Sequence, residues 1–148
     1  MNNVLKLVGA AALFAALSHG TLAADYKVWM KGSAGQEHRF EPAFLKIAAG
    51  DTVTFSPEDQ GHNVERISGP EGTEPFVSIF NRDLTVTFSV DGLYAYKCSP
   101  HVKYGMVGLI QVGDSTAGVD SARAADLSEK AKSQMKALLA KAGIAVAD

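Results

Sequence analysis

The chain has 148 residues, of which 47% are hydrophobic and 20% charged, and its formal net charge is −2. This length predicts one domain with a core of its own, the ordinary composition excludes a disordered chain, and the near-neutral charge excludes a nucleic-acid partner. The one cysteine, Cys98, excludes an intramolecular disulfide and any all-thiolate zinc or iron–sulfur site within a single chain.

Residues 1–23 have the features of a secretory signal peptide. Lys6 is their only charged residue, residues 8–17 form an almost wholly apolar run, and residues 21–23 put small side chains at the outer positions of a cleavage site. An uncleaved anchor is the alternative, but an apolar run of about ten residues is too short to cross a bilayer. We expect cleavage after Ala23, a periplasmic mature protein and no membrane attachment afterwards.

Residues 24–114 alternate between apolar and polar side chains as β-strands do. Alternating runs occupy residues 26–31, 52–55 and 84–88, runs of β-branched or aromatic residues occupy 93–98 and 107–112, and a further strand-like run lies at 62–67. Turn residues such as Gly50-Asp51 and Asp91-Gly92 separate them. Short strands at this spacing predict an all-β sandwich.

Residues 115–148 show helical periodicity instead. Asp120 or Ser121 is expected to cap a short helix that runs through Leu127, and Ser128 to cap a second helix that stops at Gly143. One side of the second helix is apolar, and the other carries lysines that we expect to be solvated: Ala131, Met135, Leu138, Leu139 and Ala142 against Lys130, Lys132, Lys136 and Lys141. The helices are predicted to pack on the sandwich as a C-terminal extension.

The segment around Cys98 has the spacing of a metal site. Cys98, His101 and Met106 form a C-x2-H-x4-M motif between two predicted strands, and His62 precedes another strand-like run. Loops at one end of a sandwich bring such residues together, and two imidazoles, one thiolate and one thioether are the ligands of a blue-copper site. A metal bond also explains an unpaired cysteine in an exported chain, for which a free thiol and an intermolecular disulfide are the alternatives.

Each of these residues also has an ordinary explanation taken singly. Cys98 fits a small buried apolar side chain, Met106 fits core packing, and a lone histidine is most often a hydrogen-bonded residue. Their common loop and the Gly-His-Asn motif around His62 favour the metal site. His38 has no partner motif, so we expect it to be exposed and exclude it from the ligands.

Several motifs resemble those of the cupredoxins, and within that family those of the pseudoazurin branch. They are Phe-Glu-Pro at 40–42, Gly-Asp-Thr-Val-Thr-Phe at 50–55, Gly-His-Asn-Val-Glu at 61–65, Lys-Cys-x-Pro-His at 97–101, Gly-Met-Val-Gly at 105–108 and Gln-Val-Gly-Asp at 111–114. The resemblance covers residues 24–143. It implies an eight-stranded Greek-key sandwich with two C-terminal helices and one copper ion, Cu+ or Cu2+, bound by His62, Cys98, His101 and Met106.

The chain departs from the family pattern at two places beside the predicted ligands. His38-Arg39 stands where Met-Val is usual, and Val102-Lys103-Tyr104 replaces a stretch rich in glycine and methionine. An imidazole, a guanidinium and an ammonium are thereby placed near the site.

The resemblance implies a monomeric one-electron carrier, not an enzyme, that exchanges electrons with nitrite reductase or a c-type cytochrome through its His101 end. Asn63 is expected to hydrogen-bond to the Cys98 loop, and Pro100 to stiffen that loop without offering an N–H to the sulfur. Three lysines, Lys31, Lys97 and Lys103, are candidates for a basic rim that meets an acidic partner.

Three other functions compete with this interpretation. Copper storage or delivery would use the same ligands. A multicopper enzyme needs further histidine clusters, which three histidines outside residues 1–23 do not supply. A metal-free interaction domain would bind no copper tightly.

Overall fold

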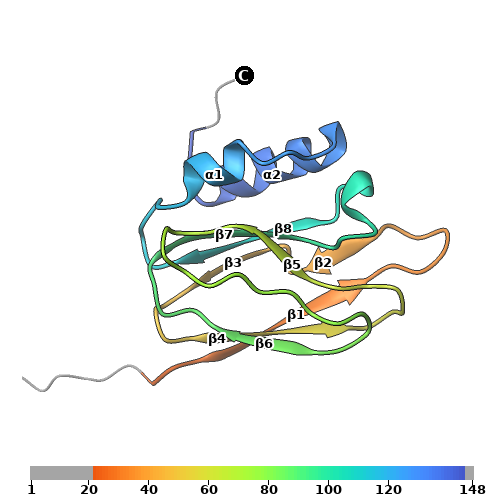
Figure 1. Ribbon diagram of the computed structural model, residues 1–148, viewed down its shortest axis with the longest axis horizontal. Coiled ribbons are helices and arrows are strands. Elements are labelled where there is room, and N and C mark those ends of the chain that lie inside the picture. Colours follow the sequence, from red (N-terminus) through yellow and green to blue (C-terminus); the bar gives the residue numbers. More distant parts are fainter. Residues whose placement is uncertain (1–21, 146–148) are drawn as a thin grey trace, which may run out of the picture.

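The computed structural model describes residues 22–145, which form eight strands, two α-helices and one short 3-10 helix (Figure 1). The elements are β1 (Asp25–Lys31), β2 (Arg39–Glu41), β3 (Phe44–Ile47), β4 (Thr52–Pro57), β5 (Glu65–Ser68), β6 (Leu84–Thr87), β7 (Gly92–Lys97), η1 (Val102–Tyr104), β8 (Val107–Val112), α1 (Val119–Arg123) and α2 (Glu129–Lys141). The predicted eight-stranded sandwich with two C-terminal helices is confirmed.

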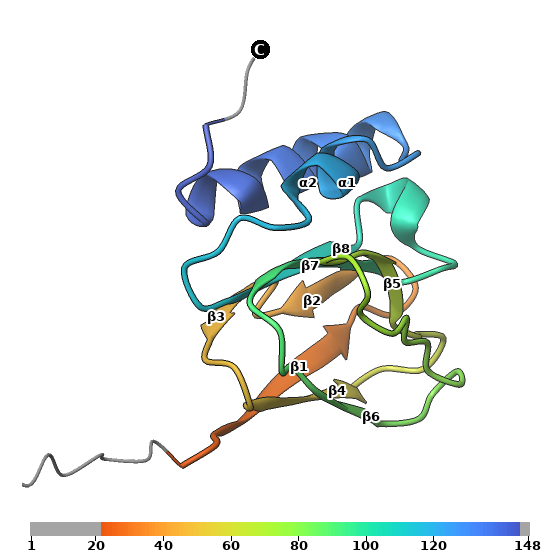
Figure 2. The same cartoon turned by 60° about the vertical axis from the view of Figure 1, so that its left-hand side comes forward.

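The strands form two four-stranded sheets that face each other. One sheet has the order β2-β1-β4-β6 and the other β3-β8-β7-β5. β1 pairs antiparallel with β2 and parallel with β4, and β3 pairs parallel with β8. Both helices cover the outer face of the second sheet, and the first sheet lies on the far side (Figure 2). The protein therefore has three layers, with one core between the sheets and another under the helices.

Burial follows these layers. In β4, Val53 and Phe55 are fully buried between the sheets, while Thr52 and Thr54, which alternate with them, are partly exposed. β7 and β8 are buried along their length, because one face meets the other sheet and the other face meets the helices. Their sequences are consequently apolar along the strand, apart from Lys97 at the end of β7 and Gln111 in β8.

The second helix begins as predicted. The Ser128 hydroxyl accepts a hydrogen bond from the Ala131 N–H (3.3 Å) and donates one to the Val102 carbonyl (3.2 Å). This one side chain therefore caps α2 and ties it to η1. The predicted apolar face of α2 is buried against β7 and β8. Neither helix of the described chain combines the length and the apolar character that a membrane span requires.

Two predicted element boundaries are wrong. β5 begins at Glu65 rather than at His62, because the His62 N–H and carbonyl bond to Asn81 instead of joining the sheet. α1 ends at Arg123, and Gly118 occupies its N-cap position in the left-handed conformation (φ 91°). A Cβ at Gly118 would lie 2.7 Å from a backbone oxygen of β7, so close packing selects this glycine.

The Tyr96 ring is fully buried between Phe40 and Phe55, with centroid distances of 4.8 and 5.0 Å. Its hydroxyl has no hydrogen-bond partner among residues 22–145. Because an unpaired buried hydroxyl destabilises a fold, Tyr96→Phe should raise the free energy of unfolding by about 1 kcal/mol in urea titrations. Tyr94→Phe is the matched control: the Tyr94 hydroxyl donates to the Val90 carbonyl (2.8 Å), so its loss should lower stability by about 1 kcal/mol. Equal effects of the two substitutions would show that the Tyr96 hydroxyl does not destabilise the core.

Candidate metal centre

The loop between β7 and β8 brings the predicted sulfur ligands together. Cys98 directly follows β7 and Met106 directly precedes β8, and these strands are antiparallel neighbours. The Cys98 N–H donates to the Met106 carbonyl (3.1 Å), and the His101 N–H donates to the Cys98 carbonyl (3.1 Å). The loop is thus closed by its own backbone, which fixes where the side chains of Cys98 and His101 begin.

Three donor atoms from two distant segments converge beside this loop. The Cys98 Sγ lies 3.6 Å from the His62 Nδ1 and 3.5 Å from the His101 Nδ1, and the two Nδ1 atoms are 3.2 Å apart. A point equidistant from all three lies about 2 Å from each, which is the length of transition-metal bonds to imidazole and thiolate. The geometry of this triangle fits a single metal ion.

Hydrogen bonding fixes the tautomer of the buried histidine. The His62 Nε2 lies 2.8 Å from the Gly32 carbonyl, and a carbonyl oxygen only accepts, so Nε2 carries the proton. The Nδ1 lone pair of His62 is therefore free and faces the sulfur. Backbone carbonyls orient metal-binding histidines in this way.

Burial keeps the donors uncharged in the copper-free protein. It lowers the pKa of His101 to about 4, and repulsion from Lys103 and from the protonated forms of His38 and His62 adds to the effect. It also lowers the pKa of His62 and raises that of the Cys98 thiol. At neutral pH both imidazoles thus present lone pairs, whereas the thiol has to lose its proton when a metal binds.

Asn63 bridges to the Cys98 loop through Ser99. The Ser99 N–H donates to the Asn63 Oδ1 (2.8 Å), and the Asn63 amide donates to the Ser99 Oγ (3.0 Å). The Ser99 hydroxyl in turn donates to the Glu65 carboxylate (2.7 Å). The expected hydrogen bond from Asn63 is present, and it links the His62 segment to the residue after Cys98.

The remaining two predicted site residues, Met106 and Pro100, differ in their exposure to solvent. Met106 is buried in the core cluster that contains Cys98. Pro100 is exposed in the turn between Cys98 and His101 and has no N–H to donate.

His38 contradicts the prediction that it is exposed and without a partner. It is half-buried, and its ring is stacked on that of His101 with centroids 3.8 Å apart and planes 5° apart. Nitrogen atoms of His38, His62 and His101 all lie within 4.8 Å of one another. Stacked rings direct their in-plane lone pairs along separate planes, so His38 and His101 do not point at one ion. No local sequence motif predicts the stacking of His38 on His101, because the turn between β1 and β2 brings the two residues together.

Comparison with known proteins agrees with this geometry. The family model of copper binding proteins of the plastocyanin/azurin family matches residues 26–113. The pseudoazurin of Paracoccus pantotrophus is 45% identical over 139 residues, which are 91% of this chain and 95% of that protein. The chain belongs to this family, in its pseudoazurin group.

Solved pseudoazurins share the fold over most of their length. The structure from Methylobacterium extorquens AM1 has a TM-score of 0.73 and 30% identity, covering 79% of this chain and 98% of that one. The structure from Hyphomicrobium denitrificans has a TM-score of 0.71 and 33% identity, covering 84% and 99%.

The donor set also fits the metal of this family. A thiolate with two neutral imidazoles suits copper in both oxidation states, and one cysteine supplies one such site. Pseudoazurins are electron carriers and not enzymes, so this chain is a type 1 copper electron-transfer protein.

The lowered pKa values predict how the copper-free protein responds to acid. His101 titrates near 6.5 in the unfolded chain and near 4 in the folded protein, so the unfolded state binds more protons between these values. The free energy of unfolding should therefore be undiminished above pH 6.5 and fall as the pH drops toward 4. Urea titrations at several pH values measure this, and His101→Asn should give a shallower decline; an equally steep decline in that variant would contradict the assignment.

Proposed function

We propose that the chain is a periplasmic carrier that donates electrons to a respiratory reductase such as nitrite reductase. The proposed copper ligands are His62, Cys98, His101 and Met106. The observation that supports this most is the closed triangle of the Cys98 sulfur and two Nδ1 atoms with sides of 3.2–3.6 Å. When bound, copper supplies a single electron by alternating between Cu+ and Cu2+.

The protein's part is to hold the donors still. His62 and Cys98 are fully buried, and backbone and side-chain hydrogen bonds restrain the segments that carry them. Because these hydrogen bonds restrain the donors independently of the metal, little rearrangement has to accompany a change of oxidation state. A copper-delivery protein needs accessible ligands instead, so this burial favours the carrier over storage or delivery. A carrier should transfer copper to a chelator slowly and exchange electrons quickly, whereas a delivery protein should do the reverse.

Replacing the sulfur tests the ligand assignment. Cys98→Ser should abolish the intense visible charge-transfer band of the Cu(II) form, because a serine oxygen cannot replace a thiolate in that transition. Visible and EPR spectra of the copper-loaded protein measure this. Ser99→Ala changes the neighbouring loop residue and should leave the colour; a coloured Cys98→Ser protein would show that the copper is held elsewhere.

The proposal that the protein is exported depends on the predicted signal peptide at residues 1–23, of which 1–21 lie outside the described part of the chain. We propose that they are removed after Ala23, leaving the sandwich (24–114) and the helical extension (115–148) in the periplasm. The protein recovered from the periplasmic fraction for the spectra should then begin at Ala24 by mass spectrometry, and an intact N-terminus would argue for an anchor.

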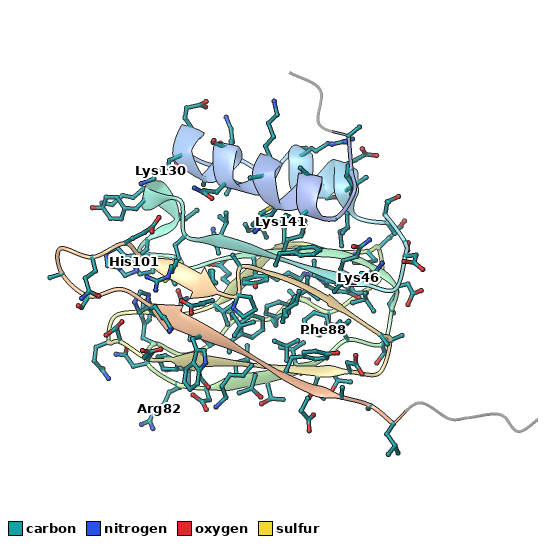
Figure 3. All side chains as sticks on the ribbon, turned by 180° about the vertical axis from the view of Figure 1, so that it is seen from behind. Lys46, Arg82, Phe88, His101, Lys130 and Lys141 are labelled. Atoms are coloured by element: carbon teal, nitrogen blue, oxygen red, sulfur yellow. The ribbon has the colours of Figure 1, made fainter. Side chains whose placement is uncertain are left out.

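The partner is proposed to dock at the end where His101 lies, because His101 is the predicted ligand ring closest to solvent. In Figure 3 this end lies away from Lys46 and next to Lys130. Tyr104 is half-exposed at this end, and exposed Ile79 and Phe80 lie just before Asn81, whose N–H bonds to the His62 carbonyl. A partly apolar contact surface suits a partner that has to dissociate quickly.

The expected basic rim is smaller than its three lysines suggest. Lys31 pairs with Glu41 and Glu58 (3.4 and 3.0 Å), and Lys97 pairs with Glu65 (3.8 Å). Lys103 alone of the three forms no ion pair within residues 22–145. Of these three lysines, Lys103 is therefore the one best placed to steer an acidic partner.

Neutralising Lys103 tests this docking end. Lys103→Gln should lower the second-order rate constant of electron transfer to nitrite reductase by about threefold at low ionic strength. Lys141→Gln removes the same charge from the last turn of α2, about 16 Å along the helix from Lys130, and should have little effect. Stopped-flow kinetics of the two variants decide the matter: equal rates would exclude docking at the His101 end.

A further inference from the structure

We propose that His38 is a positioning residue of the copper centre, which holds the rings of both histidine ligands through two separate contacts. The inference rests on the proposed ligand set. It concerns a residue outside that set, which directly precedes β2 and faces Gly32 across the turn from β1.

The first contact is with His101. The two imidazoles are stacked with centroids 3.8 Å apart and planes 5° apart. Rotation about the terminal side-chain torsion of a histidine is soft, so an unsupported half-buried ring can turn its Nδ1 away from the metal. A parallel ring against its face blocks that rotation. Tyr104 is more distant and inclined, at 6.4 Å and 32° from His101, so His38 is the closer support.

The second contact reaches His62 through one backbone oxygen. The His38 Nδ1–H donates to the Gly32 carbonyl (3.0 Å), and the His62 Nε2–H donates to the same oxygen (2.8 Å). His38 thereby fixes the acceptor that sets the orientation of the buried ligand. The Asp59 carboxylate accepts from the Gly32 N–H (2.7 Å) on the other side of this residue.

The conformation of the turn at Gly32 allows its carbonyl to accept hydrogen bonds from both His38 and His62. Gly32 has a φ of 111°, and a Cβ there would lie 2.5 Å from the Glu37 carbonyl oxygen. Only glycine lets the chain pass that close to the residue before His38. The tight turn delivers His38 to the ring of one ligand and to the hydrogen-bond acceptor of the other.

Two roles for His38 can be distinguished: closing the turn between β1 and β2, and orienting the rings of the two proposed histidine ligands. A residue that only closes the turn would affect stability and leave the metal unchanged. A residue that orients ligand rings affects how well copper is held, and loss of such outer partners weakens metal binding by about tenfold to a hundredfold.

Two substitutions separate the contacts. His38→Leu removes both the flat ring and the hydrogen bond, whereas His38→Phe keeps a flat ring for His101 and removes only the bond to Gly32. Arg39→Gln is the matched control, because Arg39 is exposed, pairs with Glu41 and contacts neither ligand in the described chain. The readouts are the Cu(II) dissociation constant by chelator competition, the EPR spectrum and reduction potential, and, in the copper-free protein, 13C relaxation of the His101 ring.

We expect the dissociation constant of His38→Leu to rise about tenfold, with altered EPR parameters and greater mobility of the His101 ring. His38→Phe should keep the His101 ring ordered and lie between His38→Leu and the unsubstituted protein in affinity. Arg39→Gln should match the unsubstituted protein.

Two results would overturn the inference. An unchanged affinity, EPR spectrum and ring mobility in His38→Leu would reduce His38 to a turn residue, and equal effects of leucine and phenylalanine would eliminate the stacking contact. If the unsubstituted protein bound no copper, the proposed function would fail instead, and the relaxation of the His101 ring would still report whether His38 restrains it.

Discussion

The pairing of β7 with β8 is the constraint on which the site depends. The two strands have to be joined by the loop that carries Cys98, His101 and Met106, and the Cys98 N–H to Met106 carbonyl bond closes that loop. Everything around it holds the loop in place: α2 covers the outer face of β8, and Asn63 bonds to the residue after Cys98. The His62 segment then needs only to approach from the side for the donors to meet.

Below pH 6.5 the donor cluster works against the stability of the copper-free fold. Two imidazoles and a thiol are held within 3.6 Å of one another and are wholly or partly buried, which makes charging His62 or His101 unfavourable. The two apolar cores offset this cost, with buried aromatic rings on one side of β7 and β8 and the helices on the other. Bonds from these donors to a copper ion would offset their crowding, so copper binding would stabilise the fold.

Local patterns in the sequence predict the elements and the chemistry of the loop. The spacing of Cys98, His101 and Met106 carries the ligand types directly, and the Ser128 cap is a local signal that the structure confirms. The contacts of His38 and the ion pairs of Lys31 depend on which turns and strands lie side by side in the fold. Residue spacing along the sequence does not predict such neighbours. The predicted start of β5 is wrong for a related reason, because His62 looks like a strand residue until Asn81 is seen to take its backbone bonds.

The hydrogen bonds of the Ser128 hydroxyl connect the second helix with the short helix η1 in the loop after β7. The Ser128 hydroxyl caps the N-terminus of α2 by accepting a hydrogen bond, and it donates one to the carbonyl of Val102, one residue beyond His101. Fraying of the first helical turn therefore removes one restraint on the loop, and a loop movement that displaces the Val102 carbonyl also weakens the helix cap. In terms of local unfolding, the start of α2 and the loop that carries the proposed ligands share a restraint, which connects the helical tail to the proposed copper site.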